Sequence, residues 1–244
     1  MPRGPRIWSE SGYMHIYTRG NGKQILFEQR EDYLFYLHLL KRYSSETKVT
    51  VCAFCLMENH THMLVCDREQ NISLMMEKIG TTYSGYFNRK YERTGHLFDG
   101  RYKSNPIDSE DYLLTVFRYI LNNPQKANIC TAAEYPWSSY DHYGLSSSFV
   151  DTSVFQQLLG SREEYEAYIA AKYEDYPELE GGIRDDEWAK KVIRENLHIE
   201  SGTVLQSYDM KSRNEALALL KRKGLSLRQI ERLTGIPRRT IKNA

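Results

Sequence analysis

Residues 49–66 read V-T-V-C-A-F-C-L-M-E-N-H-T-H-M-L-V-C, and the other elements of the chain can be placed around them. The first part, 49–57, is rich enough in apolar residues to be a central strand, and residues 60–66 form another strand. The short Glu58-Asn59 connection makes the two strands a hairpin. Because side chains alternate faces along a strand, we expect His60 and His62 to project from the same face of the sheet.

A pair of histidines on one strand face has two interpretations. The side chains can bind one divalent ion between them, provided that a third ligand arrives from another element. Taken alone, such a pair is more often a surface or hydrogen-bonded core feature. A structural zinc module that combines the pair with C-A-F-C is disfavoured, because Cys52 and Cys55 are three residues apart on a strand and face opposite ways.

Elements on either side of the hairpin complete the predicted fold. In chain order they are a strand at 12–19, a helix from residue 31, the hairpin, a helix around 74–87, a strand near 100–107 and a helix from 109 to 123. This order predicts a ferredoxin-like α+β fold, an antiparallel sheet with flanking helices and one additional helix. We expect the helices to cover one face of the sheet, so that the last helix can lie over the histidines.

The last of these helices carries further candidate residues. Ser109 is a good N-cap, and Pro124 is expected to end the helix at Asn123. At about 100° per residue, Tyr119 and Asn123 lie about 40° apart on the flank of the apolar stripe, so they project together. Tyr112 lies one heptad before Tyr119 on the same flank. Spacing within the helix therefore leaves both tyrosines open as a nucleophile.

Composition is that of a globular protein, with 41% hydrophobic and 27% charged residues in 244. The chain has no run of 18 apolar residues and no basic-then-apolar N-terminal signal, so we expect a cytoplasmic protein without a membrane partner. The four cysteines are expected to be reduced. Charge is uneven: 17 basic against 14 acidic side chains at 1–130, six against 15 at 131–200, and ten against three at 201–244.

These patterns predict three parts of the chain. They are a folded domain at 1–145, an acidic helical or linker region at 146–207 and a DNA-binding tail at 208–244. We expect Y-P-W-S-S-Y at 135–140 to pack back onto the sheet and 162–173 to form an amphipathic helix. The acidic stretch at 174–187 is interpreted as a linker or solvated surface.

Two segments have the composition of nucleic-acid-binding surfaces. At 86–104 cations alternate with aromatic side chains, which suits phosphates and stacked bases, although a solvated helix followed by an amphipathic strand explains the pattern equally well. The tail resembles a helix-turn-helix with Gly235 at the turn; the alternative is a small basic helical bundle. The candidate DNA-contacting residues are Arg89, Lys90, Arg93, Arg101 and Lys103 in the first segment, and Arg238, Arg239 and Lys242 in the tail.

Four motifs occur along the first part of the chain. They are H-T-H at 60–62, G-H-L-F-D-G-R-Y-K-S at 95–104, Y-I-L-N-N-P at 119–124 and Y-P-W-S-S-Y at 135–140. In this order and spacing the chain resembles the REP-associated tyrosine transposases, relatives of the single-tyrosine HUH transposases. One departure is Thr61, where the family usually has an apolar residue. Thr61 faces away from the histidines, so we expect an effect on packing only.

The resemblance implies a metal-dependent single-stranded DNA endonuclease and strand transferase that acts at DNA hairpins through a 5′-phosphotyrosine. His60 and His62 match the metal-binding pair, and Tyr119 matches the nucleophile. Asn123 matches the polar residue that completes a site for Mg²⁺ or Mn²⁺. The implied location is the nucleoid, and a homodimer is compatible with the sequence. The alternative is a DNA-binding regulator that keeps the fold without cutting.

Overall fold

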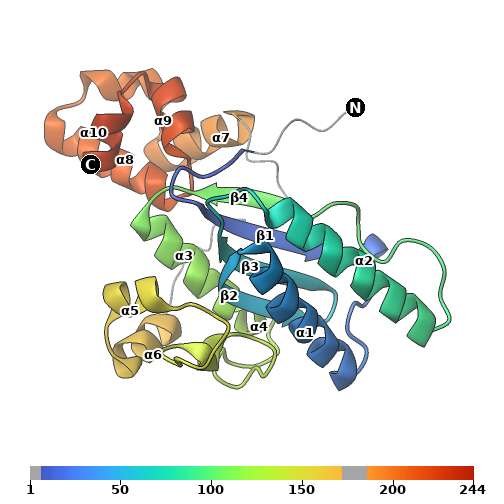
Figure 1. Ribbon diagram of the computed structural model, residues 1–244. Coiled ribbons are helices and arrows are strands. Elements are labelled where there is room, and N and C mark those ends of the chain that lie inside the picture. The colour runs from blue at the N-terminus through green and yellow to red at the C-terminus, as the bar shows by residue number, and fades with distance from the viewer. Residues whose placement is uncertain (1–6, 172–185) are drawn as a thin grey trace.

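The computed structural model describes residues 7–171 and 186–244, and its centre is a four-stranded antiparallel sheet (Figure 1). The strands are β1 (Tyr13–Arg19), β2 (Thr50–Met57), β3 (His60–Cys66) and β4 (Lys103–Ile107). Their order across the sheet is β2-β3-β1-β4. The crossovers are α1 (Arg30–Thr47) and α2 (Ile72–Lys90). This is the predicted ferredoxin-like arrangement, and the hairpin of β2 and β3 is confirmed.

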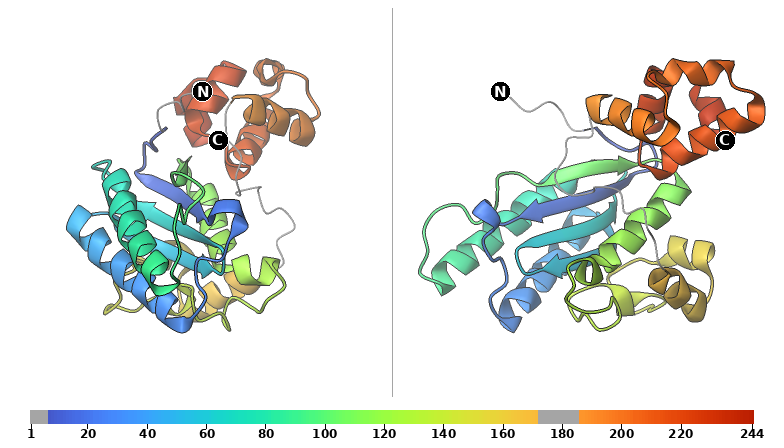
Figure 2. Two further views of the ribbon diagram at one scale, coloured as in Figure 1. Left: turned by 90° about the vertical axis from the view of Figure 1, so that its right-hand side faces the viewer. Right: turned by 180° about the vertical axis from the view of Figure 1, so that it is seen from behind.

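The two faces of the sheet carry separate layers of helices. α1 and α2 pack against each other and on the face that presents Ile16 and Met63. The other face presents Leu64 and packs against α3 (Glu110–Leu121). Figure 2 shows α3 on the side of the sheet away from α1 and α2. The expectation that the helices share one face was therefore wrong, because the second face is also apolar and needs a helix to exclude water.

Local capping explains how α3 begins and ends. The Ser109 hydroxyl accepts a hydrogen bond from the backbone N–H of Tyr112 at 3.3 Å, as an N-cap should. α3 ends at Leu121, two residues earlier than predicted, and a short helix, α4 (Asn123–Lys126), follows at once. Pro124 lies in the first turn of α4, where its missing N–H costs no hydrogen bond. The proline therefore redirects the chain into a new helix instead of ending helical structure.

The chain after α4 returns to the edge of the sheet, as predicted for 135–140. The backbone N–H of Leu56 donates to the carbonyl of Trp137 at 2.9 Å, and that of Ser139 donates to the carbonyl of Phe54 at 3.0 Å. These hydrogen bonds pair backbone groups along the edge of β2, which would otherwise be open to pairing with another chain.

Two further helices, α5 (Ser153–Leu159) and α6 (Arg162–Ala170), share the core of α3. Phe155 stacks on Phe117 with ring centroids 3.9 Å apart, and Tyr165 is buried beside them. Residues 146–171 thus belong to the sheet domain, and not to a separate region as expected. α6 agrees with the helix predicted from residue 162. The acidic stretch predicted at 174–187 lies, up to residue 185, outside the described residues.

A second hydrophobic core organises residues 186–244. Its elements are α7 (Asp186–Leu197), η3 (Gly202–Ser207), α8 (Met210–Arg222), α9 (Leu227–Thr234) and α10 (Arg238–Asn243). Ile193 of α7 and Leu205 of η3 are buried in the same cluster as Leu217 of α8, so this core begins upstream of the expected boundary at 208. Gly235, between α9 and α10, has a φ of 72°, which favours glycine. No helix among the described residues is long and apolar enough to cross a membrane.

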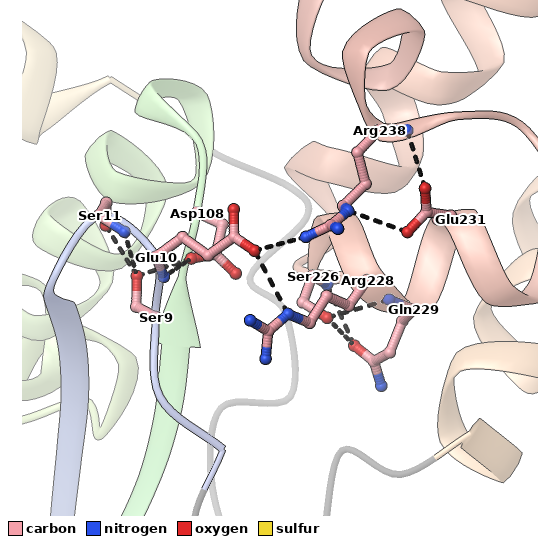
Figure 3. Close-up of polar contacts among 9 residues, drawn as sticks. All are labelled: Ser9, Glu10, Ser11, Asp108, Ser226, Arg228, Gln229, Glu231 and Arg238. Carbon is pink, nitrogen blue, oxygen red and sulfur yellow. Dashed lines mark hydrogen bonds and ion pairs between the residues drawn. The ribbon is translucent and has the colours of Figure 1, made fainter.

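This tail packs against the end of the sheet where β1 begins and β4 ends. Figure 3 shows Glu10, just before β1, between two arginines of the tail. Glu10 Oε1 lies 2.7 Å from Arg238 Nη1 and 3.3 Å from Arg228 Nε. On its other side Arg238 is bound by Glu231, with 2.9 Å between Nε and Oε2. These ion pairs are partly exposed, so they orient the tail more than they stabilise it.

Candidate active site

The predicted histidines lie where β3 and β1 run side by side. In the antiparallel register Arg19 pairs with His60 and Tyr17 pairs with His62. Because alternate residues share a face, His15 and Tyr17 stand beside the histidine pair, on the face that α3 covers. The register therefore surrounds the pair with polar side chains from a strand that is more than 40 residues away in the sequence.

Three imidazoles and one phenol ring form the centre of the site. The rings of His60 and His62 meet edge to face, with centroids 5.1 Å apart. His15 stacks on His62 at 5.2 Å, and its Nε2 lies 2.9 Å from His62 Nδ1. Tyr17 contacts His62 at 4.9 Å and His60 at 5.9 Å. As predicted, Thr61 points to the opposite face, where its hydroxyl forms a buried hydrogen bond.

His62 has the properties of a metal ligand. It is fully buried, and its Nε2 has no hydrogen-bond partner among residues 7–171 and 186–244. Burial, followed by the neighbouring His15 and His60, holds the pKa of His62 well below its usual range, so the ring is neutral. A buried lone pair without a partner is costly, and a bound metal ion would satisfy it.

Tyr119 reaches the histidine cluster from α3. Its ring meets His62 edge to face at 5.4 Å and His15 at 6.1 Å. These contacts distinguish Tyr119 from Tyr112, which lies two turns earlier on the same helix. Tyr119 exposes 0% of its surface, so its hydroxyl is not accessible to a large substrate in this conformation.

Asn123, the first residue of α4, is held next to Tyr119. Its Nδ2 donates a hydrogen bond to the backbone carbonyl of Tyr119 at 3.0 Å, so Oδ1 is the atom that could bind a metal ion. In the part of the chain that the structure describes, no three His, Cys, Asp or Glu side chains form a metal-binding group. His60 and His62 would therefore need Asn123, the DNA or water as further ligands.

Two cations that the sequence did not single out lie beside the cluster. Lys126 Nζ is 5.0 Å from the centre of the Tyr119 ring. After burial and the other histidines, Lys126 and Arg19 are the charges that lower the pKa of His62. The spacing of Lys126, one heptad after Tyr119, could have indicated it. Arg19 could not be recognised as a neighbour of the histidine cluster, because the sequence does not indicate which strand lies next to β3.

The predicted DNA-contacting cations in the sheet domain differ in their surroundings. Arg89, Arg101 and Lys103 are exposed. Lys103 Nζ lies 5.8 Å from the centre of the Tyr17 ring, which places this cation next to the histidine cluster. Contact of all three with DNA phosphates stays a prediction.

Lys90 and Arg93 are already engaged by other side chains. Lys90 Nζ lies 2.7 Å from Asp32 Oδ1, and two tyrosine hydroxyls donate to the same buried carboxylate. Arg93 donates to the side-chain oxygen of Gln24. Their DNA contact stays a prediction, and Lys90 would have to leave a buried acceptor to make it.

The predicted cations of the tail lie far from the histidines. Arg239 and Lys242 are exposed on α10, whereas Arg238 is held by Glu10 and Glu231. The tail adjoins the first residues of β1, and β1 reaches His60 only at its last residue. The tail and His60 are therefore separated by about the length of β1, roughly 20 Å for seven residues.

Comparisons with known proteins find a similarity over residues 9–123. These residues match the family model described as "Transposase IS200 like". The fold is similar to that of a REP-associated tyrosine transposase bound to a REP hairpin, with 14% identity and a TM-score of 0.51 over 63% of this chain and 96% of that chain. A protein described as a transposase from Deinococcus radiodurans R1 matches with 16% identity and a TM-score of 0.35, over 54% of this chain and 99% of that one. No curated protein matches the chain.

Proposed function

We propose that the protein is a metal-dependent endonuclease and strand transferase for single-stranded DNA at hairpins. The match of residues 9–123 to the IS200-like transposase model supports a DNA-processing function of this kind. In this proposal Tyr119 is the nucleophile, and His60 and His62 would hold the metal ion. The observation that carries this proposal is the contact between the rings of Tyr119 and His62, at 5.4 Å. It brings a phenol from α3 onto a neutral imidazole whose Nε2 is buried and has no partner among the described residues.

The proposed reaction exchanges one phosphoester bond for another. The Tyr119 oxygen forms a bond to phosphorus while the bond from phosphorus to the 3′ oxygen breaks. The phenol loses its proton, and the 3′ oxygen gains one and leaves as a hydroxyl. Because the phosphotyrosine keeps the energy of the phosphodiester, attack by a 3′-hydroxyl rejoins the strands without ATP.

An ordinary phenol, with a pKa near ~10, is a weak nucleophile, so the site must stabilise its anion. Lys126 is placed beside the Tyr119 ring to supply positive charge. A divalent ion bound by His60, His62 and Asn123 would neutralise charge on the phosphate oxygens. Two imidazoles and a carboxamide leave positions open for phosphate and water, which suits Mg²⁺ or Mn²⁺.

The proposed substrate is a hairpin with a single-stranded flank. The similar REP-associated transposase is bound to a REP hairpin, which supports the same class of substrate here. Single-stranded DNA would enter beside Lys103, and the stem would extend towards Arg239 and Lys242 of the tail. The distance of roughly 20 Å corresponds to about six base pairs at ~3.4 Å each, so a short stem can contact both regions.

A covalent adduct tests the proposal directly. The protein is incubated with Mn²⁺ or Mg²⁺ and single-stranded hairpins from the flanks of its own gene, and the products are separated on a denaturing gel. We expect a band of protein joined to DNA that requires metal, and mass spectrometry of its peptides should find the modification on Tyr119. His60→Ala and His62→Ala should abolish the adduct and leave hairpin binding largely intact.

A non-cleaving DNA-binding regulator is the second candidate. The observation in its favour is the complete burial of Tyr119, which keeps the hydroxyl from DNA in the conformation described. Tight binding of hairpins without any adduct, with either metal and at all incubation times, would support the regulator and reject the endonuclease.

A further inference from the structure

His15 forms a buried side-chain pair with His62 that the proposed chemistry does not yet use. Both side chains are 0% exposed, and their rings are nearly parallel, with an interplanar angle of 10°. His15 Nε2 lies 2.9 Å from His62 Nδ1. The two residues are not directly opposite in the sheet, because His15 pairs with Leu64 and His62 with Tyr17. The contact is therefore a diagonal one, which selects a particular ring orientation on each strand.

A neutral imidazole carries a proton on one ring nitrogen and a lone pair on the other. The hydrogen bond that Nδ1 makes, as donor or as acceptor, therefore determines whether Nε2 carries the lone pair or the proton. When His62 Nδ1 donates its proton to His15 Nε2, the lone pair of His62 lies on Nε2. Nε2 is the nitrogen that is buried without a hydrogen-bond partner among the described residues. In the opposite tautomer, Nε2 would carry the proton and could not bind a metal ion. A metal ion at Nε2 therefore requires the proton on Nδ1, and His15 Nε2 is the acceptor that lies within hydrogen-bond distance of it.

We propose that His15 is a positioning residue: it accepts the Nδ1–H of His62, fixes the tautomer and orientation of that ring, and so presents the Nε2 lone pair to the metal ion. This inference rests on the proposed metal site. His15 takes the place that a carboxylate or backbone carbonyl often takes behind a metal-binding histidine. Because its ring also meets the Tyr119 ring edge to face at 6.1 Å, His15 contacts both the proposed ligand and the proposed nucleophile.

Three substitutions separate this role from simple packing. His15→Gln keeps an acceptor oxygen at about the position of Nε2, His15→Asn is too short to reach His62 Nδ1, and His15→Leu fills volume without any acceptor. In the full-length protein we expect His15→Asn and His15→Leu to weaken Mn²⁺ binding by about 10- to 100-fold, as measured by calorimetry, and His15→Gln to stay close to wild type. Circular dichroism confirms that each variant is folded. If His15→Leu does not fold, the Mn²⁺ affinities of His15→Gln and His15→Asn are compared instead.

A second measurement does not involve the metal at all. Long-range ¹H–¹⁵N spectra of metal-free protein distinguish the two tautomers of a histidine ring. Wild type and His15→Gln should show His62 protonated on Nδ1, whereas His15→Asn should show a mixture.

A wild-type His62 protonated on Nε2, or folded Asn and Leu variants with wild-type Mn²⁺ affinity, would overturn the role of His15. A wild type that shows the Nδ1–H tautomer but binds no Mn²⁺ would instead reject the metal site of the proposed function, so the two failures can be distinguished.

Discussion

Tyr119→Phe removes one oxygen from the centre of the site and leaves every ring contact of this side chain in place. The Phe ring can keep its edge-to-face contacts with His62 and His15 and its position under Lys126. The loss in unfolding free energy is therefore limited to the interactions of one hydroxyl, about 1 kcal/mol. For a domain of this size that is a decrease in Tm of about 2–4 °C. Hairpin affinity should not change, because binding depends on cations elsewhere.

The covalent adduct, in contrast, should fall by at least about 10³-fold, the scale on which loss of a nucleophile lowers turnover. Quantitative denaturing gels with labelled hairpin and Mn²⁺ measure this change. Tyr112→Phe is the matched control. Tyr112 is also buried in α3, but it lies two helical turns before Tyr119, the residue that contacts His62. An adduct that persists in Tyr119→Phe and disappears in Tyr112→Phe would refute the assignment.

Four further predictions follow from other side chains. Lys126→Met should slow adduct formation at saturating DNA, whereas Lys126→Arg should not, because the cation lies beside the Tyr119 ring; equal single-turnover rates would contradict this role. Arg89→Gln should weaken hairpin binding and lower its salt slope by about 0.7–0.9, whereas Lys90→Gln should do neither, because Lys90 is bound by Asp32. Burial would raise the pKa of Asp32, but hydrogen bonds from Lys90 and Tyr91 lower this pKa below its usual value. The ionised Asp32 side chain therefore stabilises the fold above about pH 4, and this stabilisation is lost as the pH falls through the folded-state pKa. Asp32→Asn should thus cost about 2–3 kcal/mol at neutral pH in denaturant titrations, and progressively less as the pH falls below about 4. Glu10→Gln should free Arg228, leave Arg238 bound by Glu231 alone, and raise hairpin affinity at low salt; unchanged affinity in binding titrations would mean that these arginines do not reach DNA.

Much of the candidate site could be predicted because its signals are local. His60 and His62 are two residues apart on a strand, and the structure places their rings together. Tyr119 and Asn123 are one helical turn apart, and the structure joins them by a hydrogen bond. The end of α3 was predicted less well, because a proline after Asn123 is compatible with both a stop and a new helix.

The amino-acid sequence by itself determined the strands, the helices, their order and the faces on which His60, His62 and Tyr119 lie. Periodicity, capping and turn chemistry act over a few residues, so they can be read along the chain. Only the tertiary structure decided that β1 lies beside β3, which brings His15, Tyr17 and Arg19 to the histidine pair. It also decided that Lys90 is bound by Asp32 and Arg238 by Glu10, across 58 and 228 residues. Such contacts depend on which elements pack together, and side-chain spacing within one element does not contain that information.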